Sequence, residues 1–523
     1  MSWKQWKKGM VMIVVGMMML SLIGCGTDTS QEEVETVGSN NETEANKEKE
    51  DVVLKLGGGD WGYPSPYLHY SRGPGIYKMQ LIFDSLLEYG EEGLIPWLAK
   101  EWEVSEDGLN YIFTLQEGVK WHDGQVLTAE DVKFSFEFSE KHPPVQNYIM
   151  VGDQSIIKEI EILEDGRVKF TFAEKNATIL EKIGTVRIIP EHIWSEVEDP
   201  ESFQDERAVI GCGPYTLTNY SKEHSTYEFT AFKDYWGPKQ KVEKIQFVPV
   251  SDEIMAFENE EIDQIGVGAD LLDRYMGDPT FTVLENPAFW GYRLTLNMEK
   301  NPIFKEKEIR QAIAYGIDQQ EMVDKVERGA AVVASAGYLP EDHVWYNPAV
   351  KKYPFDEDKA KTLLGDEKVS FQLLTGNSNA EVRIAELMKI SLDKVGIEVN
   401  VQSADTKTRD NAIVTGNYEV ALTGHGGWGN DADILRTRYS DILGYDNEEI
   451  NKLALEQLQE LDTEKRKEMI FSLQELISEE MPMIPIYNTT GYTVYRPSTY
   501  DGWMYMFDHH NVSHGKLSYL ERK

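Results

Sequence analysis

The amino-acid sequence predicts a mixed α/β protein with one α/β lobe and one sheet-rich lobe. Alternating apolar and polar residues predict strands at 369–373 and 397–401, and apolar residues at helical spacing predict a helix between them, at 384–395. This strand–helix–strand order is the building block of an α/β layer. Richer alternation, as at 111–115 and 167–172, instead indicates antiparallel sheet in the N-terminal part.

Other periodic segments extend this architecture. Apolar residues from 309 to 317 predict a helix with one buried face. A long amphipathic helix is predicted from about Thr463 to Glu480, because its period is regular and Pro482 stops it. A strand predicted at 418–422 leads into the glycine-rich segment 424–429, and the sequence contains no internal repeat.

Residues 121–131 have the composition of a turn followed by a helix start. Trp-His-Asp-Gly at 121–124 predicts a tight turn, and Thr128 is a typical helix N-cap. Glu130 and Asp131 would lie in the first turn, where the helix dipole favours acids. We therefore interpret His122 as a residue of the fold rather than a ligand.

The stretch from Leu54 to Tyr70 contains glycines at the spacing of a dinucleotide-binding turn, at 57, 59 and 62. Such a turn needs a helix directly after it, and Pro64 and Pro66 prevent one. The sequence therefore argues against a nucleotide site. It predicts an irregular loop that carries several aromatic side chains: Trp61, Tyr63, Tyr67, His69 and Tyr70.

Composition limits the class of partner. The 523 residues include 52 basic and 90 acidic side chains, a formal net charge of −38, which argues against nucleic acid or anionic lipid as a partner. A soluble acidic surface is the simpler interpretation. The body, from about Val52 to Lys523, is too long for one core and predicts two or three domains. Because Cys25 and Cys212 are the only cysteines, no disulfide framework is expected, and we interpret Cys212 as a packing residue.

The N-terminus has the pattern of a secretory signal. Three lysines precede an apolar run from Met10 to Ile23, and the run ends in Leu-Ile-Gly-Cys at 22–25. These four residues resemble the lipobox of bacterial lipoproteins, which implies a signal peptide at 1–24 and a lipid on Cys25. The alternative is an uncleaved membrane anchor, for which the run is short. The polar remainder of 25–51 is expected to be a disordered tether.

A resemblance to a known family rests on blocks that follow one another along the body. The first, from Leu81 to Phe138, resembles the family signature almost residue for residue. The later blocks are 211–217, 235–247, 308–318, 353–365 and 481–492. In this ordered set the chain resembles the extracytoplasmic solute-binding proteins of family 5, which serve ABC importers of peptides and nickel.

The resemblance implies an α/β, two-lobed fold like that of the periplasmic binding proteins, with a hinge and an extra inserted α+β domain. It implies strands near 290–297 and 484–493 as the hinge, and closure of the lobes over a ligand. The expected domains are a discontinuous first ligand-binding domain, an inserted second domain and an opposing ligand-binding lobe. Their ranges are 52–80 with 209–290 and 490–523, then 81–208, then 291–489.

The resemblance also implies where cargo binds. The aromatic loop would face a segment at 427–433, in which Asp431 matches an aspartate that receives the α-ammonium group of a peptide in relatives. The alternative is that Asp431 and Asp433 cap the following helix. The ligand-binding residues we expect are Trp61, Tyr67, His69, Trp290, Tyr292, Trp428 and Asp431.

Three of the ten histidines lie at 509–514. His509 and His510 match a histidine pair of nickel-binding relatives, and His69 could supply a third imidazole for Ni(II) as cargo. The alternative is that these histidines are surface or interlobe hydrogen-bonding residues. His425 is a further candidate, whose direction the surrounding glycines leave open.

The leading hypothesis is therefore a lipid-anchored, extracytoplasmic and monomeric binding protein that delivers a short peptide to a membrane permease and its ATPase. Nickel, free or chelated, is the second hypothesis. Oligosaccharide is a third, because Trp61, Trp290 and Trp428 could stack on sugar rings. A surface hydrolase is disfavoured because the chain has neither His-Glu-x-x-His nor Gly-x-Ser-x-Gly. No cofactor is expected.

Overall fold

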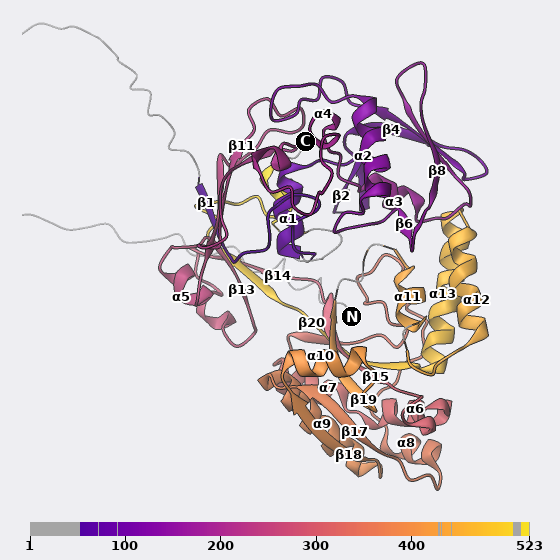
Figure 1. The fold of residues 1–523 in the computed structure, drawn as a ribbon. Helices are drawn as coiled ribbons and strands as arrows, with labels where there is room; N and C mark the ends of the chain where they lie inside the picture. Colours follow the sequence, from indigo (N-terminus) through magenta and orange to yellow (C-terminus); the bar gives the residue numbers. More distant parts are fainter. Residues whose placement is uncertain are drawn as a thin grey trace, which may run out of the picture. The chain divides into compact units, whose positions relative to one another are not determined.

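Strand β1 begins the described part of the chain in the computed structural model, which describes residues 53–521 apart from 72, 92, 427, 428, 430, 441 and 506–513. We call residues 53–285 and 492–521 the upper lobe and residues 290–489 the lower lobe, after their places in Figure 1. Cys25, Trp428, His509 and His510 lie outside the described residues.

One sheet of the upper lobe joins the strand at residues 53–58 to three strands between residues 215 and 249. Its order is β1 (Val53–Gly58), β12 (Lys244–Pro249), β11 (Thr226–Ala231) and β10 (Tyr215–Ser221). β1 and β12 run parallel, whereas the other neighbours are antiparallel. Helix α1 (Gly73–Ile82) contacts β10, and Leu81 and Ile82 join the core of this sheet.

A second sheet of the upper lobe is antiparallel throughout, as the alternation predicted. Its order is β4 (Ala99–Val104), β5 (Asn110–Leu115), β9 (Val168–Phe172) and β8 (Ile157–Ile162). Helix α2 (Ala129–Lys141) contacts it, and Thr128 is the N-cap, because Asp131 Oδ2 accepts the Thr128 backbone N–H at 2.8 Å. The smaller elements are β2 (Leu87–Gly90), β3 (Gly93–Pro96), β6 (Met150–Val151), β7 (Gln154–Ser155), α3 (Ile179–Gly184), α4 (Glu191–Trp194) and η2 (Glu206–Val209).

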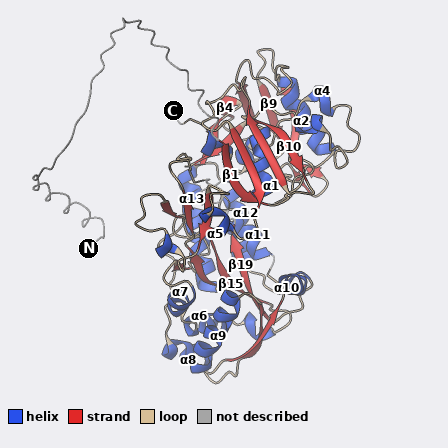
Figure 2. Ribbon diagram, turned by 90° about the vertical axis from the view of Figure 1, so that its left-hand side faces the viewer, coloured by secondary structure: helices blue, strands red, loops and turns tan. Residues whose placement is uncertain are grey.

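The lower lobe is built on a six-stranded sheet (Figure 2). Its order is β16 (Ala331–Val333), β20 (Met483–Thr489), β15 (Trp290–Leu296), β19 (Val420–Gly426), β17 (Ser370–Gly376) and β18 (Glu398–Ala404). The predicted strand–helix–strand unit is confirmed, because β17 and β18 run parallel and α9 (Asn379–Lys394) connects them.

The helices of the lower lobe begin and end where the sequence supplies caps. Helix α13 (Thr463–Glu480) starts after Asp462, which accepts the Lys465 N–H at 3.0 Å, and stops at Met481, whose φ is 45°. The predicted helix at 309–317 is α6 (Lys307–Gly316). The others are η4 (Pro302–Lys305), α7 (Gln319–Val326), α8 (Glu357–Leu364), α10 (Thr406–Val414), α11 (Ile434–Ser440), α12 (Glu448–Glu456) and η5 (Gln457–Gln459). No helix within the described residues has both the length and the apolar character needed to cross a bilayer.

The chain passes between the lobes twice, at 286–289 and at 490–491. The two crossings lie side by side, because Asn286 N–H donates to Gly491 O at 2.7 Å and the Asn286 amide lies 3.1 Å from Thr493 Oγ1. Above the crossings is a three-stranded sheet with α5 (Glu253–Glu258) and η3 (Leu272–Arg274) beside it. Its order is β13 (Gln264–Val267), β21 (Tyr492–Tyr495) and β14 (Thr282–Glu285). The domain boundaries expected from the sequence stay a prediction.

Four buried charges fasten the C-terminal turn η6 (Lys516–Tyr519) to the upper lobe. Lys516 Nζ lies 2.5 Å from Asp84 Oδ1 and also pairs with Glu88, which in turn pairs with Arg187. The indole N–H of Trp236 donates to Asp84 at 3.0 Å. Two cations thus balance two carboxylates. Removal of any one of these four side chains would leave an opposite charge buried without its partner.

We expect Lys516→Met to lower the free energy of unfolding by about 3–5 kcal/mol, because Asp84 and Glu88 would lose their shared cation. Urea unfolding followed by tryptophan fluorescence measures the change. The matched control is Lys120→Met: Lys120 pairs with Asp234 at 2.7 Å, but their side chains are 43% and 58% exposed. That control should cost less than about 1 kcal/mol. Equal losses in both variants would contradict the role given to Lys516.

Candidate functional site

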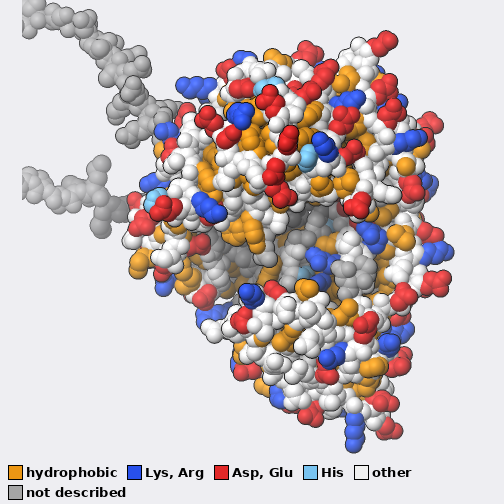
Figure 3. All heavy atoms as spheres, in the orientation of Figure 1, with side chains coloured by type: hydrophobic (Ala, Val, Ile, Leu, Met, Phe, Trp, Pro, Cys, Tyr) orange, Lys and Arg blue, Asp and Glu red, His pale blue; other side chains and the backbone are white. Residues whose placement is uncertain are grey.

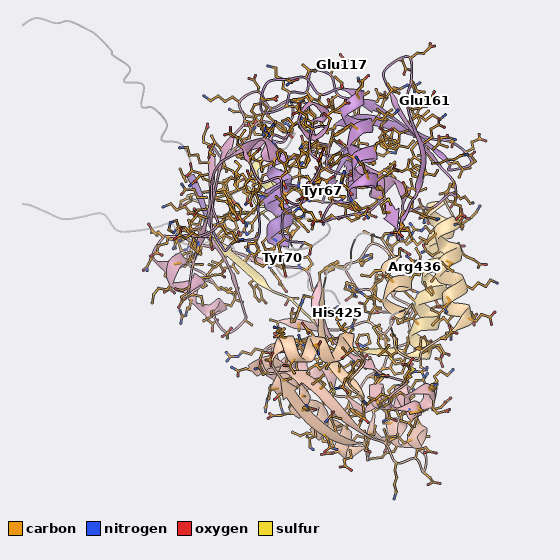
Figure 4. The ribbon with its side chains drawn as sticks, in the orientation of Figure 1. Tyr67, Tyr70, Glu117, Glu161, His425 and Arg436 are labelled. Atoms are coloured by element: carbon orange, nitrogen blue, oxygen red, sulfur yellow. The ribbon has the colours of Figure 1, made fainter. Side chains whose placement is uncertain are left out.

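A hollow separates the lobes in the space-filling view (Figure 3). Residues of the upper and lower lobes border it, and Figure 4 shows Tyr70 and His425 on its two sides. Tyr70 belongs to the loop between β1 and α1, and His425 to β19. The two segments that the sequence analysis singled out as an aromatic loop and a glycine-rich strand end therefore border the same cleft.

The aromatic loop has no helix, as the prolines predicted, and it is held by its own backbone. Tyr70 N–H donates to Trp61 O at 2.8 Å, and Gly62, at φ +82°, forms a bridge with His69. The hydroxyl of Tyr227 on β11 donates to Gly62 O and accepts the Trp61 N–H, both at 2.8 Å. The loop therefore rests on the four-stranded sheet and presents Tyr70, 51% exposed, to solvent.

Tyr67 and His69 point inward from this loop. The Tyr67 ring packs on Phe138 and Trp194, at ring distances of 5.8 and 5.2 Å. His69 is 3% exposed, its Nδ1 lies 2.8 Å from Ser65 O, and burial lowers the pKa of its imidazole. Both line a cavity of about 30 Å³, which is room for a single water. The ligand role expected for Tyr67 and His69, and the metal role expected for His69, stay predictions.

The position of the Trp290 side chain explains why β19 has glycine at 424 and 426. Its side chain is 45% exposed and meets the Tyr292 ring edge to face at 4.9 Å. A Cβ added at Gly424 or Gly426 would lie 2.5 Å from the Trp290 ring, so only glycine lets the indole lie on this strand. The strand accordingly runs on to Gly426 instead of ending at 422. Trp290 is partly exposed to solvent, whereas Tyr292 is buried against Tyr487, and the ligand role expected for both stays a prediction.

The carboxylate of Asp431 is already engaged within the lower lobe. Arg466 donates to both of its oxygens, at 2.6 and 2.7 Å, and the Asp433 N–H donates to Oδ1 at 2.8 Å. Arg466 is buried, and its Nε donates to Gln457 at 2.9 Å. The expected contact between Asp431 and a ligand ammonium stays a prediction. Asp433 holds Arg436, at 2.6 and 2.8 Å.

Arg466 was missed in the sequence, although it carried a signal. It lies on the buried face of α13, one turn before Ile470, where the helical pattern calls for an apolar residue. A charged residue in such a position needs a buried partner. Its partner, Asp431, lies on a separate segment, so a single sequence could not identify it.

His343 is a second residue that the sequence analysis missed. Its Nε2 lies 3.2 Å from Gly429 O, and its Nδ1 accepts the Trp345 N–H at 3.2 Å. These contacts fit the neutral imidazole with a proton on Nε2, and burial lowers the pKa of His343 to about 4. His343 thus ties Gly429, in the segment before α11, to the rest of the lower lobe.

The lobes also touch on the side away from the crossings, where α13 approaches the upper lobe (Figure 1). Ala177 N–H donates to Leu458 O at 2.8 Å, and the Leu461 side chain lies over Gly108. Leu458 follows Gln457, the residue that Arg466 contacts. The Asp431–Arg466 pair therefore lies directly behind this second contact between the lobes.

Cys212 and His122 are both used by the fold. Cys212 is buried in the core, and burial raises the pKa of its thiol well above the ordinary value. His122 Nε2 lies 3.0 Å from Gly213 O, and its Nδ1 accepts the Gly211 N–H. Both interpretations made from the sequence are confirmed. Within the described residues no group of three His, Cys, Asp or Glu side chains could hold a metal ion.

We expect Asp431→Asn and Arg466→Gln each to lower the free energy of unfolding by about 2–4 kcal/mol, because each leaves a buried partner unpaired. Urea unfolding of both single variants and the double variant measures the coupling, and the double variant should lose less than the sum. Asp433→Asn, beside the more exposed Arg436, is the control and should cost under about 1 kcal/mol. Strict additivity of the two single effects would contradict the pair.

Known proteins are similar to this chain over most of its length. The family model "Bacterial extracellular solute-binding proteins, family 5 Middle" matches residues 93–442. The dipeptide-binding protein of Escherichia coli K12 is 26% identical over 455 residues, which is 78% of this chain and 84% of the relative. Di/tripeptide-binding protein 1 of Pseudomonas aeruginosa is 27% identical over 81% of this chain and 86% of the relative.

Solved structures share the fold. The ABC transporter substrate binding protein CtaP of Listeria monocytogenes superimposes with a TM-score of 0.76 at 23% identity, over 90% of this chain and 99% of that one. NikA of Brucella suis, in complex with Fe(III)-EDTA, gives a TM-score of 0.77 at 21% identity, over 90% and 100%. The two-lobed α/β architecture expected from the resemblance is confirmed. The chain belongs to the bacterial extracellular solute-binding proteins of family 5.

Proposed function

We propose that this chain is the solute-binding lipoprotein of an ABC importer and that it captures a short peptide between its lobes. One observation carries the proposal. Relatives named for dipeptide or di/tripeptide binding match 78% and 81% of the chain, which is more of it than either lobe alone contains. Peptide is therefore the cargo class that similarity across the whole binding body favours.

The cleft suits a short peptide in its chemistry. Tyr70 and Trp290 offer exposed rings, each with a polar tip, from opposite lobes. Such rings bury apolar area of many side chains without selecting one, while the peptide backbone and ends supply hydrogen bonds. A peptide held between the lobes would add contacts between the two existing ones, at the crossings and at Leu458.

In this proposal, binding of cargo drives closure of the lobes, and closure makes the loaded protein recognisable to the membrane components. The crossings at 286–289 and 490–491 permit rotation of one lobe against the other, as in hinge closure around a ligand. Cargo that contacts both lobes favours the closed arrangement by its differential affinity for that arrangement. In our proposal the permease and its ATPase recognise this closed form, and the cargo leaves without chemical change.

We propose that the protein is anchored to the outer face of the membrane by a lipid on Cys25. The support is the apolar run that ends in Leu-Ile-Gly-Cys at 22–25 and the polar stretch to residue 51. One acyl-bearing cysteine with a long polar tether would hold the binding body near its permease and leave it free to rotate.

The cargo can be identified by calorimetry with dipeptide and tripeptide mixtures and, separately, with NiCl2. We expect peptides to give a heat of binding. Their Kd should be in the micromolar range or tighter, which corresponds to a free energy of binding of roughly −8 kcal/mol or a more negative value. Trp290→Ala should weaken peptide binding because it removes an exposed ring from the lower side of the cleft. Heat with NiCl2 alone, abolished by His509→Ala with His510→Ala, would replace peptide by nickel.

Lipidation has its own test in cells that process lipoproteins. Cys25→Ser should move the protein from the membrane fraction to the soluble extracytoplasmic fraction. Intact mass of the wild-type protein should show a diacylglycerol-bearing N-terminal cysteine. Cys212→Ser makes the same chemical change at the buried cysteine and should leave the protein in the membrane fraction. Retention of the Cys25 variant on membranes would contradict the anchor.

A further inference from the structure

The contact between the lobes on the side away from the crossings joins a glycine to a leucine. Gly108 lies in the hairpin turn between β4 and β5 of the upper lobe, and its φ is +69°. Leu461, in the turn before α13 of the lower lobe, lies over it, and a Cβ added at Gly108 would overlap Leu461 Cδ1. Any other residue at 108 would therefore push the leucine of the opposite lobe aside.

The same three residues occur in a second hairpin of this sheet, where they have no such neighbour. Residues 106–108 and 164–166 are both Glu-Asp-Gly, and Gly166, at φ +82°, lies in the turn between β8 and β9. A Cβ added at Gly166 would meet no atom of the described residues within 4 Å. The turn alone accounts for glycine at 166, whereas at 108 glycine also makes room for a side chain of the other lobe.

A hydrogen bond between backbone groups of the two lobes belongs to the same contact. Ala177 N–H donates to Leu458 O at 2.8 Å, and Leu458 is 7% exposed. The segment that carries Ala177 is joined to the hairpin, because Phe172 N–H donates to Leu109 O at 2.9 Å. The hairpin and the segment 173–177 therefore form one surface of the upper lobe.

The lower lobe holds its side of the contact in place with a buried amide. Gln457 is 1% exposed, and its side chain accepts from Arg466 Nε at 2.9 Å and donates to Ala454 O at 3.1 Å. Glu460 N–H donates to Gln457 O at 3.3 Å, which closes the turn that carries Leu461. The turn at 457–461 is thus fixed by Arg466, the arginine that pairs with Asp431.

Helix α3 of the upper lobe faces this arginine pair. Glu181 lies on α3, and Tyr89 Oη donates to its Oε1 at 2.6 Å. Burial raises the pKa of Glu181, the charge of Asp431 adds to that rise, and the charge of Arg466 opposes it. These influences reach Glu181 from the other lobe. The contact therefore extends from Gly108 along the segment 173–177 to the Asp431–Arg466 pair.

We propose that the hairpin at 105–110 and the turn at 457–461 form a latch, which holds the lobes together whether or not cargo is bound. The latch lies where α13 approaches the upper lobe, away from the crossings (Figure 1). Rotation about the crossings must separate Leu461 from Gly108 and break the Ala177–Leu458 hydrogen bond. The latch therefore sets the ratio of closed to open molecules before cargo arrives, and this ratio enters the apparent affinity for cargo.

Distances between spin labels, measured by double electron–electron resonance without cargo, test the latch. Suitable label sites are Val104→Cys, at the end of β4, and Leu455→Cys, on α12, because these side chains are 45% and 56% exposed on either side of the latch. The full-length chain carries Cys25→Ser as well, so that Cys212, which is buried, is the remaining native thiol.

Two changes remove the contact from opposite sides. Gly108→Asn adds a side chain that meets Leu461, and asparagine tolerates the positive φ of the turn. Leu461→Ala removes the leucine instead. We expect each change to raise the ratio of open to closed molecules about fivefold or more. In the Leu461→Ala background, Gly108→Asn should have a smaller effect, because no leucine remains to be displaced.

Gly166→Asn is the matched control, because it makes the same change in the same tripeptide of the same sheet. It should keep the wild-type distances, and urea unfolding shows that each variant is folded. Unchanged distances in both folded latch variants, or an equal shift in Gly166→Asn, would overturn the latch. Because no cargo is present, such a result would leave the proposed peptide function in place, and a failure to bind peptides would leave the measured latch in place.

Discussion

The contact between the two chain crossings is the constraint on which the binding architecture depends. Because Asn286 bonds to Gly491 and approaches Thr493, the crossings form a single narrow connection at one side of the cleft. The lobes can then open and close about this side without separating. The second contact, on the other side, consists of the Ala177–Leu458 hydrogen bond and the Leu461 side chain over Gly108, so anything between the lobes is enclosed by a covalent connection and a weaker noncovalent contact.

Regular elements could be predicted from the sequence because their signals are local. The period of α13 and its stop at Pro482, the strand–helix–strand unit around α9, and the alternation in β5 and β9 all lie within a few turns or strands of chain. Pro64 and Pro66 were enough to exclude a nucleotide turn, since each restricts its own backbone and that of the preceding residue.

The site could be predicted only in part, because its contacts join distant segments. The glycines at 424 and 426 were visible, but their reason is the Trp290 ring, which a cross-strand register places on them. Asp431 was identified, whereas Arg466, which holds it, comes from another helix. Tyr338 accepts a hydrogen bond from Arg293 of β15, and a single sequence contains no signal for a contact between such distant segments.

The acids and the arginines of the lower lobe differ in how their charges are compensated. Asp431 and Asp433 are each neutralised by an arginine of the same lobe, while Arg293 donates to the hydroxyl of Tyr338. In a chain with a formal charge of −38, the long-range field repels anions, so an anionic group is held only where local cations outweigh that field. Partial burial strengthens this local attraction, because the site has fewer waters to screen it. Recognition of a charged group in the cleft would therefore arise from short-range geometry, and it would persist at salt concentrations that screen the surface charge.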